Sequence, residues 1–129
     1  RKESSAASDV YKRQYILMPR KRNQTSRKIY QREAQKLTRE AYMRWVSLSK
    51  YFIKLLKRFF KTKSSFENLI IMGGQDYVFL SGARKYARNQ AKSTFIVIPA
   101  VGHICNIDGR NVFNNHVIQF FFDNQSAGK

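Results

Sequence analysis

Residues 68–76 read NLIIMGGQD, and residues 93–103 read STFIVIPAVGH. The run Asn68–Met72 has large apolar side chains without polar alternation, which is typical of a strand buried on both faces of a parallel sheet. The run Ser93–Ile98 is rich in β-branched residues and predicts a second strand. The segment between them, from Phe79 to about Gln90, has helical spacing. The sequence therefore predicts a parallel strand–helix–strand unit.

The prediction extends in both directions from this unit. Downstream, Pro99 to Asp108 is expected to be a loop, and Val112–Asp123 is expected to be a closing helix. Five side chains of that helix are expected to face inward: Val112, Phe113, Val117, Phe120 and Phe121. Upstream, Thr25 or Ser26 could cap a helix that runs to Leu37, and Thr38 precedes a second helix that runs to Ser49.

The stretch Lys50–Lys61 predicts a third, amphipathic helix. Its lysines recur at steps of four, three and four on one face, and the opposite face carries apolar side chains, namely Phe52, Leu55, Leu56, Phe59 and Phe60. We expect these apolar side chains to pack on a core, as in ordinary surface helices. The alternative is a basic amphipathic helix that lies on an anionic membrane.

Charge divides the chain into two unlike parts. The 129 residues carry a formal net charge of +17. Residues 1–63 hold 19 Lys and Arg against 4 Asp and Glu, whereas residues 64–129 hold 6 against 4. An aromatic content of 14% excludes a disordered tail, and a single Cys excludes an internal disulfide framework. We expect neither a signal peptide nor a membrane span, and therefore a cytoplasmic protein.

Residues 4–14, SSAASDVYKRQ, resemble the translated sequence of a common transposon-tagging sequencing adapter at every position. We expect residues 1–14 to be adapter-derived and not native, with a natural reading frame that extends upstream. The remaining organisation is predicted as a basic helical cap or lid region over residues 15–63 and a core segment over residues 64–129.

Two side chains that can carry chemistry follow the two predicted strands. Asp76 comes after the first strand, and His103 comes after the second. Because functional side chains in open α/β sheets gather outside the carboxyl ends of the strands, we expect these two to lie near each other. A carboxylate can orient an imidazole and stabilise its protonated form, so that the imidazole acts as a general base. The alternative is a common strand-end turn beside a structural histidine.

The sequence of residues 66–123 resembles the C-terminal end of the α/β-hydrolase fold. The motif LIIMGGQD places an acid after a late strand, and VGH places a histidine after the next strand, 27 residues later. The resemblance implies an α/β fold class, with a parallel strand–helix–strand–helix end preceded by helical cap or lid segments. It also implies Asp76 as the orienting acid and His103 as the general base of a serine-type hydrolase.

The sequence departs from that family at the nucleophile. It contains no G-x-S-x-G motif and no H-G-G-G-type oxyanion loop, and in this family both lie upstream of the acid. We therefore expect a truncated hydrolase of esters or of carbon–carbon bonds next to a carbonyl, with this chain alone inactive. The expected partner is a small-molecule ester or ketone substrate.

Several other residues receive structural or open interpretations. Tyr42, Trp45 and Phe52 could line a substrate pocket, but we expect them to pack between cap helices. Cys105 is expected to be a small packing residue rather than a nucleophile, and His116 a surface residue. We predict no metal and no cofactor, because His103, Asp108 and His116 match no zinc spacing.

Two other functions remain as alternatives to the hydrolase. The basic front half could form a nucleic-acid-binding module, although the sequence shows no nucleic-acid motif and we expect no nucleic-acid partner. The stretch Lys50–Lys61 could attach the protein weakly to a membrane surface, which is compatible with a hydrolase.

Overall fold

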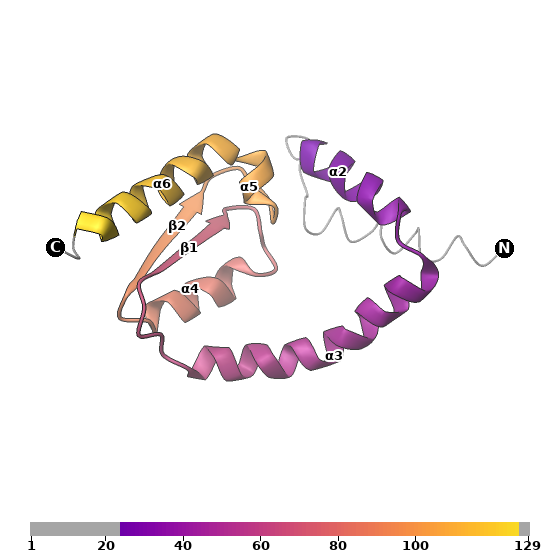
Figure 1. The fold of residues 1–129 in the computed structure, drawn as a ribbon, viewed down its shortest axis with the longest axis horizontal. Helices are drawn as coiled ribbons and strands as arrows, with labels where there is room; N and C mark the ends of the chain where they lie inside the picture. The colour runs from indigo at the N-terminus through magenta and orange to yellow at the C-terminus, as the bar shows by residue number, and fades with distance from the viewer. Residues whose placement is uncertain (1–23, 127–129) are drawn as a thin grey trace.

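The computed structural model describes residues 24–126, so the adapter-like residues 1–14 lie outside the described part. Within residues 24–126 the chain forms five helices and two strands (Figure 1). In chain order these are α2 (Gln24–Gln35), α3 (Arg39–Lys61), β1 (Asn68–Gly73), α4 (Leu80–Arg88), β2 (Ser93–Ile98), α5 (Cys105–Asp108) and α6 (Arg110–Ser126).

The second front helix begins after Thr38 as predicted, but the predicted cap of the first, Thr25 or Ser26, is wrong, because both residues lie inside the helix. Helix α2 spans Gln24–Gln35, and α3 begins after the N-cap Thr38, whose side chain accepts a hydrogen bond from the Ala41 N–H. The cap satisfies one of the free N–H groups of the first turn. The prediction of two helices over residues 38–61 is wrong, because α3 runs unbroken to Lys61. No Pro or Gly interrupts residues 39–61, so nothing in the backbone ends the helix earlier.

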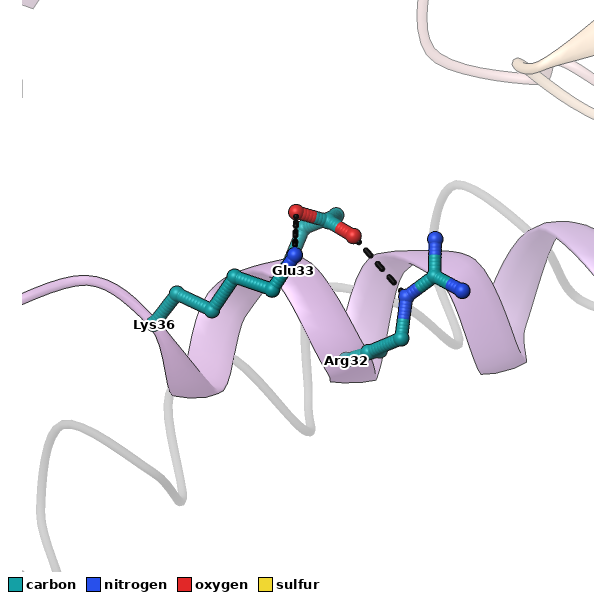
Figure 2. A network of polar contacts seen from close by, with 3 residues as sticks. All are labelled: Arg32, Glu33 and Lys36. Atoms are coloured by element: carbon teal, nitrogen blue, oxygen red, sulfur yellow. Dashed lines mark hydrogen bonds and ion pairs between the residues drawn. The ribbon is translucent and has the colours of Figure 1, made fainter.

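An exposed ion-pair network lies on α2. Glu33 accepts from Lys36 Nζ at 2.7 Å and from Arg32 Nε at 2.9 Å (Figure 2). The hydrogen bond from Lys36, followed by that from Arg32, lowers the pKa of the Glu33 carboxyl. Because all three side chains are exposed to water, this network contributes little to the stability of the fold.

The strand–helix–strand prediction is confirmed. Strands β1 and β2 pair in parallel, in a register that runs from Asn68 opposite Ser93 to Gly73 opposite Ile98. Helix α4 connects them and packs against both, and α4 and α6 lie on either side of the two strands (Figure 1). The predicted loop after Ile98 contains the short helix α5, and the closing helix α6 is present.

The predicted α/β-hydrolase fold class is wrong. Within residues 24–126 the structure is mostly helical, and its sheet has two strands rather than the many that such a fold requires. The physical reason lies in the pattern of side chains, since only two segments have the short apolar, β-branched runs of strands. The front half has helical spacing throughout and supplies no third strand.

The buried core is small. It consists of Ile98, Val101 and Cys105, with Ile71 and Phe113 packed against it. The prediction that the first strand is buried on both faces is wrong, because β1 is only partly covered along most of its length. A two-stranded sheet leaves each strand with an unpaired edge, so neither strand is enclosed. On α6, Phe113 faces the core as predicted, but Val112 and Phe121 are exposed.

Helix α3 makes few contacts with the rest of the described chain. Near its C-terminal end the Phe60 ring meets the Tyr86 ring edge-on, with the centroids 5.6 Å apart. The buried side chain of Gln90 then fastens the segment that follows α3. Its amide donates to the Thr62 carbonyl at 3.1 Å and accepts from the Ser64 N–H at 2.8 Å. The remainder of α3 extends away along one edge of the molecule (Figure 1).

Candidate active site

The parallel register places the two candidate residues at the same end of the sheet. Asp76 follows β1, and His103 follows β2. Two backbone hydrogen bonds hold the segments together beyond the strands, from Gly74 N–H to the Ile98 carbonyl and from Gln75 N–H to the Val101 carbonyl, both at 2.8 Å. The sheet thus continues as a pair of joined loops that present both side chains.

A close backbone approach makes this junction possible. A Cβ atom added at Gly73 would lie 2.0 Å from the Gly102 carbonyl oxygen. No side chain can occupy that space, so residue 73 must be glycine for the loop after β2 to sit this close. In that loop Ala100 adopts φ 60°, a left-handed conformation that alanine rarely takes. The positions of Asp76 and His103 therefore depend on two tightly fitted turns.

Asp76 and His103 are in direct contact. Asp76 Oδ2 lies 2.7 Å from His103 Nδ1, and the other carboxylate oxygen, Oδ1, accepts from the Phe79 N–H at 3.1 Å. Asp76 is only 1% exposed, whereas the His103 side chain is 41% exposed. The Phe79 ring lies beside the imidazole with the centroids 5.0 Å apart. A buried carboxylate thus holds Nδ1 of an imidazole that is itself partly exposed to water.

This arrangement fixes the tautomer of the imidazole. With Nδ1–H donating to the carboxylate, Nε2 carries a lone pair and can accept a proton. In residues 24–126 no side chain is hydrogen-bonded to Nε2. The pair therefore has the geometry of an orienting acid and a general base, but the described residues place no nucleophile beside it.

Cys105 lies two residues beyond His103 but belongs to the core. Its thiol is buried, and Sγ is 3.8 Å from the Ile71 carbonyl oxygen. Burial raises the pKa of the Cys105 thiol, with a smaller contribution from the nearby Asp76 charge. Since the thiolate is the nucleophilic form, this cysteine is a packing residue, as the sequence predicted.

The aromatic residues proposed for a pocket do not form one. Trp45 and Phe52 are mostly exposed on α3, so the expected packing between cap helices is also wrong for them. A shallow depression of about 630 Å³ runs along α4 instead. Its lining residues are Tyr77, Leu80, Ser81, Arg84, Lys85, Arg88 and Asn89. It includes neither Asp76 nor His103.

Two polar features near the site were not predicted from the sequence. Ser26 is completely buried and donates its hydroxyl to Asp108 Oδ2 at 2.5 Å, while its N–H donates to Oδ1 at 3.2 Å. This contact fastens the start of α2 to α5, which follows the His103 loop. Gln75 is also buried, and its Oε1 finds no hydrogen-bond partner among the described residues. Neither residue lies in a recognisable motif, and the Ser26–Asp108 contact spans 82 positions.

His116 lies half-buried on α6, apart from the site, and the surface position predicted for it is only partly correct. Among residues 24–126, no three His, Cys, Asp or Glu side chains are grouped in a way that could hold a metal ion.

Comparisons with known proteins add no relative. No protein family, no curated protein and no solved structure was found to match the chain.

Proposed function

We propose that Asp76 and His103 are the orienting acid and the general base of a hydrolytic site. The observation that supports this most directly is the 2.7 Å contact between the buried Asp76 carboxylate and Nδ1 of the partly exposed His103 ring. A surface ion pair would leave both groups in water, whereas here the carboxylate is buried and only the imidazole reaches solvent. The substrate class is a small ester, or a ketone with a cleavable carbon–carbon bond.

In this proposal His103 moves one proton in each half of the reaction. Nε2 takes the proton from a serine hydroxyl as its oxygen attacks the carbonyl carbon, and then gives it to the leaving group. In the second half Nε2 takes a proton from the water that attacks the acyl group, and returns it to the serine oxygen as the acyl–serine bond breaks and the acid leaves. The Asp76 carboxylate stabilises the imidazolium each time without taking the proton itself. General base catalysis of this kind contributes about 10²- to 10⁴-fold.

The serine and the oxyanion donors come from outside residues 24–126 in this proposal. The pair alone lacks an attacking oxygen, so we expect no ester turnover by the 129-residue chain. The turn after β1 supplies rigid support instead, because the Phe79 N–H fixes the second oxygen of Asp76. The carboxylate is thus prevented from rotating away from the imidazole.

The test uses the genomic reading frame that contains residues 15–129, expressed as one protein. A fluorophosphonate probe should label one serine, and p-nitrophenyl esters should be hydrolysed. His103→Ala should abolish both reactions, and Asp76→Asn should lower turnover by roughly 10³- to 10⁴-fold through the wrong imidazole tautomer.

His116→Ala is the matched control, because it removes the second histidine of the chain away from the site. It should leave labelling and turnover unchanged. Labelling that persists in His103→Ala would refute the assignment of the base, and the absence of any reactive serine in the longer protein would refute the hydrolytic function.

A further inference from the structure

One face of α3 exposes a continuous row of large apolar side chains. The row consists of Trp45, Leu48, Phe52, Leu55 and Phe59, at successive steps of three, four, three and four residues. These steps place all five on one side of a helix. Each of the five is about half exposed or more, from 49% for Leu55 to 69% for Trp45. We refer to this row as the apolar face.

The opposite side of α3 carries a row of cations. It consists of Arg39, Lys50, Lys54, Lys57 and Lys61, which we refer to as the basic face. Arg58 lies between the two faces and Arg44 beside the apolar face, so α3 holds seven basic side chains against the single acid Glu40. No ion pair with a carboxylate is formed by the basic face within the described residues.

We propose that α3 lies in the surface of an anionic lipid bilayer, with the apolar face among the upper acyl chains and the basic face at the headgroups. In that position the Trp, Phe and Leu side chains on one side of the helix leave water for the acyl region, while the Lys and Arg side chains on the other side lie near anionic headgroups. The proposal is independent of the hydrolytic site, since α3 contributes nothing to Asp76 or His103.

The charge of α3 favours lipid over other occupants. Pairing of two copies through the apolar face would bring two strongly basic helices together, without acidic groups to offset them. A nucleic acid would bind the basic face but leave the aromatic side chains in water. Only an apolar layer with a negatively charged boundary matches both faces.

The shape of the molecule permits this contact. Helix α3 runs for 23 residues along one edge, clear of the sheet (Figure 1). None of the described helices is long and apolar enough to cross a membrane. The proposed contact is therefore a helix lying flat, roughly 35 Å long at 1.5 Å per residue. Anionic lipids are concentrated in the cytoplasmic leaflet, the side expected from the sequence.

Trp45 makes the proposal directly measurable, because it is the only tryptophan of the chain and lies on the apolar face. The 129-residue chain should show a blue shift of Trp45 emission with vesicles of phosphatidylcholine containing roughly one-third phosphatidylserine. Vesicles of phosphatidylcholine alone should bind far more weakly, because they carry no net negative charge to attract the lysines. High salt should weaken binding to the anionic vesicles.

Two paired variants separate the faces. Phe52→Gln with Phe59→Gln should lower the partition coefficient by at least about tenfold, because two exposed rings no longer enter the acyl region. Lys54→Gln with Lys57→Gln should lower it by about 25-fold, at about fivefold for each cation. Both pairs are exposed, so the fold should survive the changes.

Matched controls lie outside α3. Phe66→Gln with Phe121→Gln removes two rings that are at least as exposed, and Lys85→Gln with Lys92→Gln removes two exposed cations. Both controls should stay within about twofold of the parent chain. The proposal fails if the controls lose as much binding as the α3 variants, or if Trp45 emission does not respond to anionic vesicles. If Trp45 emission shifts with protein concentration in the absence of lipid, the apolar face pairs two copies of the chain and the lipid proposal is wrong. If the chain binds duplex DNA but not vesicles, α3 is a nucleic-acid surface and the lipid proposal is again wrong.

Discussion

The sheet unit of residues 68–113 and helix α3 differ in where their apolar side chains lie, since the sheet unit buries some of them and α3 exposes them to water. In the sheet unit, small residues such as Gly73 and Gly102 let backbones meet, and a few side chains around Ile98 are buried between elements. In α3 the side chains are larger and more aromatic, yet they face water. Hydrophobicity alone therefore does not decide burial. A complementary surface must be present, and within the described chain only the sheet unit has one.

The first way to test this contrast is to break the backbone contact that builds the sheet unit. Gly73→Ala would place Cβ 2.0 Å from the Gly102 carbonyl oxygen, which is backbone and cannot rotate away. We expect a loss of about 4 kcal/mol or more in the free energy of unfolding, enough to unfold a domain this small. Urea unfolding followed by circular dichroism measures it.

Gly82→Ala is the control for that change. Its Cβ would make an ordinary contact, 3.7 Å from the Phe60 ring, and the residue lies within α4. Replacing a helical glycine should stabilise the fold by about 0.5–1 kcal/mol. If Gly73→Ala is no more destabilising than Gly82→Ala, the loops after β1 and β2 do not meet as described. The contact between Asp76 and His103, which depends on that meeting, would then also be wrong.

The second test compares one apolar side chain from each region. Ile98 is 3% exposed and lies at the centre of the core, whereas Phe59 is 61% exposed on α3. Ile98→Ala should cost about 2–4 kcal/mol through lost burial and a cavity. Phe59→Ala should change the free energy of unfolding by less than about 0.5 kcal/mol, as for other exposed sites. An equal loss for both, measured in urea, would show that α3 is buried in solution.

The third test concerns the contact that fastens α2 to the sheet unit. Ser26→Ala removes the hydroxyl that donates to Asp108 and leaves a partly buried carboxylate with one donor fewer. We expect a loss of about 1–3 kcal/mol. Hydrogen exchange should quicken across α2 while β1 and β2 stay protected. Ser47→Ala is the control, because that hydroxyl is exposed and bonds only the Arg44 carbonyl of its own helix. Equal exchange in both variants would mean that Asp108 does not hold α2.

These contrasts also explain what could be predicted from the sequence. The bounds of β2 and the start of α3 were predictable because β-branched runs and a threonine cap act locally. The meeting of Asp76 with His103 was predictable because parallel strands end at a common edge. The Ser26–Asp108 contact and the exposure of Phe52 and Phe59 were not, because they depend on which distant surfaces meet. The fold class failed for the same reason, since two strand patterns do not specify the rest of a sheet.

The smallest expected effect is a pH dependence confined to the core of the sheet unit. Burial raises the pKa of Cys105 above its ordinary value of 9.0, so the folded protein holds the proton more tightly than the unfolded chain. Its contribution is therefore fully present below about pH 9 and disappears as pH rises through the folded pKa. Urea unfolding between pH 8 and pH 10 should show stability falling with pH, by less than about 1 kcal/mol over this range. Cys105→Ala should remove that slope. An unchanged slope in Cys105→Ala would mean that the thiol titrates as freely as in water and that the core around Ile98 is open.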